Sequence, residues 1–477
     1  MPAQNAVQLV NWFPLADSVQ TRRGYQTHCS GFPGAVETLI PYQPPSGTAR
    51  LFAASGGGIY DATAAGTVGA ALVSGFGNNR WQHTAMTNAA GSFVLAVNGQ
   101  NTAQLYNGTA WANSTITGPT LSALAWCGTH HRRWWFGEAG SLRAWYLATD
   151  AITGAATSFD LGPVAQLGGF IMAMGTWTRD GGSGVDDLAV FLTSEGEVLI
   201  YAGTNPASAS DWGLRGVFRI GKPLGRRSIT RAGADLLIMT QDGFVSLASI
   251  LPVDRAQQAA RSLSAQINPV VTDSARQYGS LFGWQAFLYP RAAMCIFNVP
   301  VSGNAFEQYV FNTTTAAPAR FTGVPARCWA LLNENPYFGS GNTVCLFDTG
   351  ATDGGAPIEA LAIQAFNPFG QAAQKKAFRR VQPILLSEAP PLAGVDVVLD
   401  YRITDPLPTL VPLSSAVAMW GNAIWGSSRW AGVATYDAWR GVRGVGRMGA
   451  LRMRAQTSLA PINWISSNVN VVTGGTL

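Results

Sequence analysis

Charged residues are scarce in this 477-residue chain, where they make up 12% of the sequence. An average soluble protein contains about 25%. Lysine and arginine total 31 and aspartate and glutamate 26, which leaves a formal net charge of +5. This thinly spread excess does not identify a dedicated nucleic-acid-binding protein, although it permits contact with polyanions. Much of the surface must therefore be uncharged, or buried against partner subunits.

Cysteines and long apolar runs are also few. The five cysteines are scattered and none forms a CxxC pair, which indicates free thiols in a chain folded in a reducing cytosol. The most apolar stretch, residues 161–177, is interrupted by glycine, proline and glutamine. We therefore expect no stable membrane insertion.

Helical signals are sparse as well. The best candidate is residues 252–271, where Pro252 and Asp254 are typical of a helix start and Pro269 of a helix end. The chain is therefore predicted to be almost entirely β.

Glycine is abundant, with 54 residues, and it recurs in a pattern. An apolar strand, a glycine turn and a second strand ending in an aromatic residue, as in FAASGGGIYDAT at 52–63, returns along the chain. Successive turn glycines are 38 to 60 residues apart. One four-stranded propeller blade spans about 40 to 50 residues. The turn glycines are Gly57, Gly99, Gly140, Gly196, Gly243, Gly303 and Gly341.

Aromatic residues follow these turns at similar offsets, and we expect them to pack between adjacent blades. The sequence thus predicts an all-β fold: an irregular β-propeller of six or seven blades with an additional C-terminal β domain. An ordinary β-sandwich with many hairpins is the alternative. The predicted division is an N-terminal extended or closing segment at 1–48, the propeller at 49–360 and a C-terminal β-rich assembly domain at 361–477. The aromatic residues are Tyr60, Tyr106, Tyr146, Tyr201, Tyr309 and Phe347.

Clustered cations are concentrated in the last hundred residues. On alternating strand positions they would line a groove or tube and contact phosphate without reading base sequence. A solvated face, or salt bridges to a partner, is an equal alternative. These candidates for contact with DNA or a partner are Lys375, Lys376, Arg379, Arg380, Arg440, Arg443, Arg447, Arg452 and Arg454.

The same region is rich in tryptophan. The spacing of five to nine residues is too irregular for one helix face, and large aromatics in a glycine-rich segment are typical of interface anchors. The candidate anchors are Trp420, Trp425, Trp430 and Trp439.

Motifs that would indicate an enzyme are weak. Glycines 444, 446 and 449 match G-x-G-x-x-G, but no βαβ unit surrounds them, so strands with turns are expected. Cys127, His130 and His131 lie together, but adjacent strand residues point to opposite faces and no second ligand pair exists. We expect no catalytic residues, no metal and no cofactor. A propeller glycoside hydrolase stays possible, because its catalytic carboxylates would come together in space and not in sequence.

Several ordered motifs resemble the tail hub, or nozzle, proteins of short-tailed bacteriophages. They are NWFPLADSVQTRRGYQTH followed by LFAASGGGIYDAT, then FVLAVNGQNTAQLYNGTAW, the block GWQAFLYPRAAMCIFNVPVSGNAFEQYVFNTTTAAPARFTG at 283–323 and the ending INWISSNVNVVTGGTL. The similarity is spread over nearly the whole chain with variable spacers, and it brings no catalytic residues.

The resemblance implies a structural virion protein of the phage tail, assembled in the host cytoplasm and usually a homohexamer. Such proteins attach below the portal and adaptor rings, extend the channel for double-stranded DNA, help to retain and then conduct the DNA, and anchor tail fibres or spikes. A propeller fold is known in the family. The alternatives are a glycan-binding adhesion or fibre protein, whose exposed tryptophans would stack on sugars, and a propeller glycoside hydrolase.

Overall fold

The computed structural model describes residues 5–180, 185–403, 406–413 and 433–474. The chain is β-rich and divides into two compact units. Thr27–Glu307 and Pro325–Leu346 form what we call the propeller unit. Met1–Gln26, Gln308–Val324 and Phe347–Leu477 form the sandwich unit.

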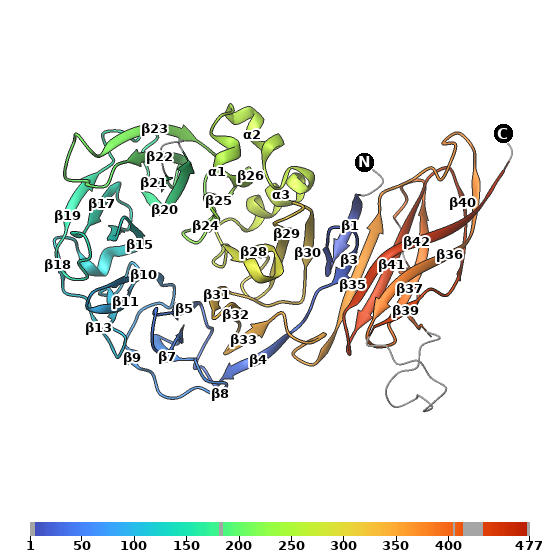
Figure 1. Cartoon of the computed structure of the whole chain (residues 1–477), viewed down its shortest axis with the longest axis horizontal. Coiled ribbons are helices and arrows are strands. Elements are labelled where there is room, and N and C mark those ends of the chain that lie inside the picture. Colours follow the sequence, from blue (N-terminus) through green and yellow to red (C-terminus); the bar gives the residue numbers. More distant parts are fainter. Residues whose placement is uncertain (1–4, 181–184, 404–405, 414–432, 475–477) are drawn as a thin grey trace. The chain divides into compact units, whose positions relative to one another are not determined.

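The propeller unit is a ring of antiparallel sheets, and the first strand of each sheet lies nearest the centre (Figure 1). Its first four sheets have four strands each. They are β5 (Thr38–Tyr42), β6 (Arg50–Ser55), β7 (Gly58–Asp61) and β9 (Val73–Ser74); β10 (Gln82–Asn88), β11 (Gly91–Val97), β12 (Gln104–Tyr106) and β13 (Trp111–Asn113); β15 (Leu124–His130), β16 (Arg133–Glu138), β17 (Arg143–Tyr146) and β19 (Thr157–Asp160); and β20 (Ile171–Asp180), β21 (Val185–Thr193), β22 (Glu197–Ala202) and β23 (Gly213–Arg219).

Three further sheets complete the ring. The last of them pairs its outer strand with β4, from the N-terminal part of the chain, so the two ends of the ring are joined. The three sheets contain β24 (Ile229–Ala232), β25 (Asp235–Thr240) and β26 (Gly243–Ser246); β27 (Gln285–Tyr289) and β28 (Met294–Pro300); and β31 (Cys328–Leu332), β32 (Asn335–Gly339) and β33 (Thr343–Phe347) with β4 (Tyr25–Ser30). Short strands in the connections are β8 (Gly66–Thr67), β14 (Ile116–Thr117) and β18 (Gly154–Ala155).

The turn glycines occupy the same place in every sheet. Each lies between the second strand of a sheet and the strand that follows, or begins that strand, so the described part of the propeller unit has seven sheets, at the upper end of the prediction. The first turn needs its glycines: Gly56 and Gly57 have φ angles of 53° and 77°, and a Cβ on Gly57 would lie 2.8 Å from the carbonyl oxygen of Phe76. FAASGGGIYDAT is therefore a hairpin turn.

The aromatics that follow the turns pack between sheets, as expected, at the positions where the contacts are clearest. Tyr106 contacts Phe52 of the preceding sheet, with ring centroids 4.7 Å apart. Tyr146 and Tyr201 belong to one cluster between the third and fourth sheets, where Tyr201 stacks on Trp212 at 5.6 Å. Two members of the predicted set, at positions 309 and 347, belong to the sandwich unit.

The α-helices follow the fifth sheet. Asp254 caps α2 by accepting a hydrogen bond from the amide of Ala256 at 3.0 Å, as predicted. Pro269 does not end a helix; it stands in the first turn of α3, where the missing amide hydrogen costs nothing. The helices are η1 (Leu121–Ala123), α1 (Leu247–Ile250), α2 (Arg255–Arg261), η2 (Ala265–Ile267), α3 (Asn268–Tyr278) and η3 (Pro290–Ala292).

The sandwich unit packs two sheets over a core that includes Trp12, Phe378, Met453 and Trp464. One sheet contains β1 (Ala6–Val10), β35 (Ala356–Gln364), β41 (Gly449–Thr457), β37 (Leu392–Leu399) and β38 (Val411–Pro412), with β30 (Pro318–Phe321) beside β1, β29 (Phe306–Asn312) beside β30, and β34 (Thr352–Asp353) beside β35. The other contains β2 (Trp12–Pro14), β3 (Val19–Thr21), β42 (Ile462–Thr473), β36 (Lys376–Ser387), β39 (Ala434–Tyr436) and β40 (Arg440–Gly446).

The unit boundaries differ from the predicted ones. Residues 38–42, placed in the closing segment at 1–48, form the first strand of the first blade, and 308–324 and 347–360, placed in the propeller at 49–360, belong to the sandwich unit. The C-terminal domain predicted at 361–477 is therefore only one part of that unit.

A buried arginine holds the separated segments of the sandwich unit together. Arg22 is 2% exposed, and it donates hydrogen bonds to Asp353 at 2.7 Å, to the side chain of Asn11 at 2.9 Å and to the carbonyl of Thr322 at 2.7 Å. A buried guanidinium needs this many acceptors to offset its lost hydration. The N-terminal segment therefore folds with residues that follow it by about three hundred positions.

A second arginine, which is half-buried, links sheets across the propeller. Arg227, just before β24 of the fifth sheet, donates to the carbonyl of Glu37 at 2.9 Å and the hydroxyl of Thr38 at 2.6 Å in the first sheet. It also donates to the carbonyl of Trp81, beside the second sheet, at 2.8 Å. Phe282 covers its guanidinium at 5.2 Å. One side chain thus links sheets that are not neighbours in the ring.

We predict that Arg227→Met lowers the free energy of unfolding by about 3 kcal/mol, because it leaves buried acceptors without a donor. Guanidinium denaturation followed by tryptophan fluorescence measures the change. Arg219→Met, on the exposed side of β23, is the control and should change stability by less than about 0.5 kcal/mol. Equal effects of the two substitutions would contradict the role of the central crossing.

Candidate functional sites

The nine cations predicted from the sequence lie in the sandwich unit, but the structure does not bring them into one group. Lys376 is fully buried, and its Nζ donates to the backbone carbonyls of Gln371 at 2.6 Å and Gln374 at 2.9 Å. This lysine stabilises the loop before β36 and has no accessible charge.

Two arginines of β41 are occupied by carboxylates on neighbouring strands. Arg452 is 5% exposed and donates to Asp396 of β37 at 2.9 Å. Arg454 donates to both carboxylate oxygens of Glu359 on β35 at 3.1 Å. The charges on this sheet are therefore neutralised in pairs.

Arginines 379, 380 and 443 lie on the other sheet, and we call them the cationic face. Arg380 lies opposite Gly441 of β40 and Asn470 of β42, next to positions such as Val381 that point into the core. Alternation along a strand then turns Arg380 and Arg443 outward. All three arginines are exposed.

No acidic residue occurs in β36, β40 or β42, the three strands of this face. The outward neighbours of the arginines are polar or small, and Asn468 donates to Gln382 at 3.0 Å. Val445 and Val472, 63% and 52% exposed, lie at one end. Among the described residues no ion pair involves the three arginines. The face is therefore positively charged without internal compensation.

The remaining predicted cations stand at the margins. Arg440 lies opposite the core-facing Val381, so it points inward, whereas Lys375 and Arg447 are exposed in connections. Asp400 accepts hydrogen bonds from the amides of Arg447 and Met448, at 2.8 and 2.9 Å, and these bonds lower the pKa of its carboxyl group.

The glycine motif at 444–449 is the end of β40, a turn and the start of β41, as expected from the missing βαβ unit. Of the tryptophans predicted as anchors, Trp420, Trp425 and Trp430 lie outside the described residues. Trp439 is 47% exposed directly before β40.

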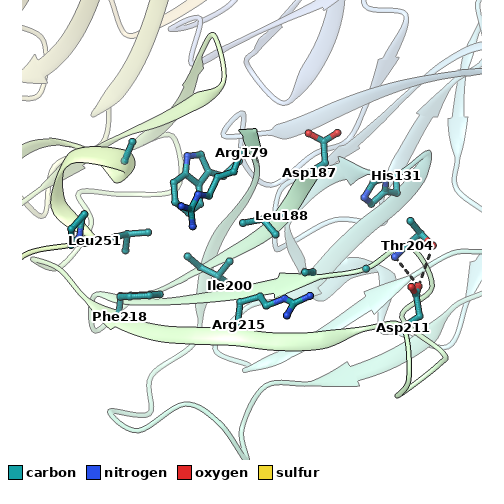
Figure 2. Close-up of a pocket in the computed structure, with 15 residues that line it drawn as sticks. His131, Arg179, Asp187, Leu188, Ile200, Thr204, Asp211, Arg215, Phe218 and Leu251 are labelled. Atoms are coloured by element: carbon teal, nitrogen blue, oxygen red, sulfur yellow. Dashed lines mark hydrogen bonds between the residues drawn. The ribbon is translucent and has the colours of Figure 1, made fainter. Parts of the chain in front are cut away.

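The propeller unit holds a cavity of about 1070 Å³ that the sequence did not reveal. It lies against the fourth sheet, and Figure 2 shows its charged and apolar lining. His131, Asp187, Thr204 and Asp211 gather at the right of the view, while Phe218 and Leu251 lie at the left. Arg179 and Arg215 lie between these ends, and the floor includes Leu188 and Ile200.

The acidic groups of this cavity already have donors. Asp211 accepts from the amides of Thr204 at 2.8 Å and Asn205 at 2.6 Å, and these hydrogen bonds lower the pKa of its carboxyl group. Asp187 accepts from the hydroxyl of Thr178 at 2.6 Å. The Asp211 carboxyl group, with its pKa lowered, is an anion at neutral pH.

The CGTHH segment forms no metal site. His130 is 2% exposed in β15, and its Nδ1 lies 2.9 Å from the hydroxyl of Thr176 in the next sheet. Burial and the neighbouring His131 lower the pKa of His130 to about 3. No group of potential metal ligands is found among the described residues. His130 is therefore a neutral packing residue between two blades.

No family model and no curated protein matches the chain. Solved structures match the chain only distantly. They include BBS1N in complex with ARL6DN, with 8% identity, a TM-score of 0.41 and coverage of 68% of this chain and 97% of that one. The Swd1 β-propeller domain of Myceliophteria thermophila has 12% identity, a TM-score of 0.37 and coverage of 66% and 100%. The designed protein Ika8 has 10% identity, a TM-score of 0.38 and coverage of 68% and 100%. At these scores the likenesses carry no argument about function.

Within the described residues, no helix is both long and apolar enough to cross a membrane.

We predict that His130 makes the propeller less stable in acid. Its folded-state pKa of about 3 lies below the unfolded value near 6.5, so protons bind first to the unfolded chain as the pH falls. Stability from this group is present above pH 6.5 and decreases below it, by about 3 kcal/mol between pH 6.5 and 4. Urea denaturation between pH 7 and pH 4 measures it.

The substitution His130→Gln should remove about 3 kcal/mol of the measured decrease. The part due to His83, whose pKa is also lowered, to about 4, should stay. His28→Gln, at a half-buried histidine of β4, should leave the decrease unchanged. A pH profile that is the same in His130→Gln and in the unmodified chain would contradict the assignment.

Proposed function

We propose that this protein is a non-enzymatic structural component of a bacteriophage tail, a hub or nozzle that assembles into a ring. The ring extends the DNA channel below the portal and adaptor, helps to retain packaged DNA, conducts it during ejection and anchors fibres or spikes. The observation that carries the proposal is the cationic face: exposed arginines on strands that contain no acidic residue. The motif resemblance to tail hubs supports it independently.

The physical reason concerns how DNA must be held and then released. Arginines on a flat sheet contact phosphate by charge, without reading the bases. Each contact releases counterions, so affinity grows with the number of cations in the lining. A small number of cations per subunit permits retention of the DNA but lets the duplex slide. The pairing of Arg452 and Arg454 with carboxylates keeps that number low.

Asp211 of the cavity does not suit the hydrolase alternative. A glycosidase acid must be protonated near neutral pH, which requires a raised pKa. The pKa of Asp211 is lowered instead. For a glycan-binding protein, the described part of the candidate tryptophan set offers one exposed ring, Trp439.

We predict weak, sequence-independent binding of double-stranded DNA whose affinity falls steeply with salt. The triple variant Arg379→Gln, Arg380→Gln, Arg443→Gln should reduce the slope of log K against log salt by about 2 to 3, because three phosphate contacts are lost. Fluorescence anisotropy with two unrelated 30-base-pair duplexes over a salt series measures the slope.

The control variant carries the same charge change on the propeller, with Arg143, Arg261 and Arg291 replaced by glutamine at exposed positions. It should keep the original slope. Preference for one duplex, or equal loss in the two variants, would contradict a role for the cationic face in DNA contact.

We also predict that the chain forms a sixfold ring on the tail axis, with a mass six times the 50.4 kDa of one chain. Light scattering across a concentration series, with and without the adaptor ring, measures the mass, and electron microscopy of the particle places the ring. Density for this chain only in peripheral fibres would overturn the hub assignment and favour the adhesion alternative.

A further inference from the structure

The cavity on the fourth sheet exists because neighbouring blades differ in size. Strands β20 and β21 have 10 and 9 residues, whereas β24, β25 and β26 of the fifth sheet have 4, 6 and 4. The fifth sheet reaches Thr178, whose amide donates to the carbonyl of Ala234 at 3.0 Å. The cavity lies beside this point, and helix α1 closes one side of it.

A register shift places a cation in this cavity. Ile200 of β22 lies opposite Gly216 of β23, but the next residue, Tyr201, lies opposite Leu214. Arg215 is therefore an extra, unpaired residue of β23, and it lines the cavity. Bulges of this kind redirect side chains beside binding sites.

The cavity contains two arginines and two aspartates, which differ in whether they already have a hydrogen-bond partner. Arg179 lies over the ring of Trp177 at 5.3 Å, which holds its guanidinium in place. Among the described residues neither Arg179 nor Arg215 has a carboxylate partner, whereas Asp187 and Asp211 already accept hydrogen bonds. The unused groups are therefore guanidinium N–H donors, which suit carboxylates.

The rest of the lining favours the binding of peptide side chains over sugars or nucleic-acid bases. Leu251, which is half-buried, gives the accessible part of an aliphatic wall that also contains the buried Leu188 and Ile200, and Phe218 is half-buried as well. Trp177 is 6% exposed, so no free indole face is available for stacking. A volume of about 1070 Å³ accommodates several residues of an extended peptide.

We propose that this cavity binds an acidic peptide segment of a partner protein, with Asp or Glu at Arg179 and Arg215 and an adjacent Leu, Ile or Phe against the aliphatic wall. This interaction goes beyond the proposed hub function and does not depend on it. The arginines are specificity-determining residues, because they exclude basic segments at the same place.

Selection of random seven-residue peptides on the full-length chain tests the proposal. We expect enriched peptides to combine acidic and large apolar residues. Fluorescence anisotropy of the best enriched peptide should show affinity reduced by about tenfold or more in Arg215→Gln and in Arg179→Gln, because each change removes a charge-assisted hydrogen bond.

Arg219→Gln is the control, since Arg219 lies exposed on the same strand and donates to Gln166 instead. Its affinity should equal that of the unmodified chain, and circular dichroism should show all variants folded. No enrichment, enrichment of basic peptides, or affinities unchanged in both cavity variants would overturn the proposal. Displacement of the peptide by inorganic phosphate at equal affinity would overturn it too, by indicating a simple anion site.

Discussion

A blade of a propeller can bury its faces only against its two neighbours, so the ring has to close before any blade is stable. In this chain strand β4 closes it by joining the outer strand of the last sheet. Arg227 adds a second constraint, because it reaches from the fifth sheet to the first and second across the centre. The charge of Arg227 also acts on a neighbour: the burial of His83 and this charge together lower the pKa of His83 to about 4. The centre of the ring is thus held by a fixed cation and a neutral imidazole, and not only by apolar packing.

The sandwich unit depends on a comparable arrangement. Arg22 gathers acceptors from three segments that are distant in sequence, and the two sheets then enclose one apolar core. Charge is distributed unequally over the two outer surfaces. On one sheet each arginine of β41 lies beside a carboxylate, and on the other the strands contain no carboxylate at all. Similar numbers of arginines thus give one neutral surface and one positively charged surface.

Local signals in the sequence were sufficient to predict the propeller, because neighbouring residues determine a glycine turn and its flanking strands. That is why the turn at Gly57 and its later equivalents marked every sheet. The unit boundaries could not be predicted in this way, since Arg22 and Asp353 are 331 positions apart. Nor could the separation of the cations, because the outward direction of Arg380 depends on a register shift after Phe378. The propeller cavity was missed for the same reason: it results from unequal strand lengths and from the shift at Arg215, which local periodicity does not encode.

The two groups of uncompensated arginines differ in shape, and shape determines what each can recognise. Arg379, Arg380 and Arg443 lie on an open sheet, where a ligand loses little water and each contact is screened by salt. Such a surface suits a long polyanion that makes many equivalent contacts. Arg179 and Arg215 are exposed at a hollow that also has aliphatic side chains, where apolar burial adds to the charged contacts. Apolar contacts beside the charged ones favour a short segment of defined composition. We therefore propose that one chain combines a weak, unselective contact for a moving polymer with a selective contact for a fixed partner, on separate compact units.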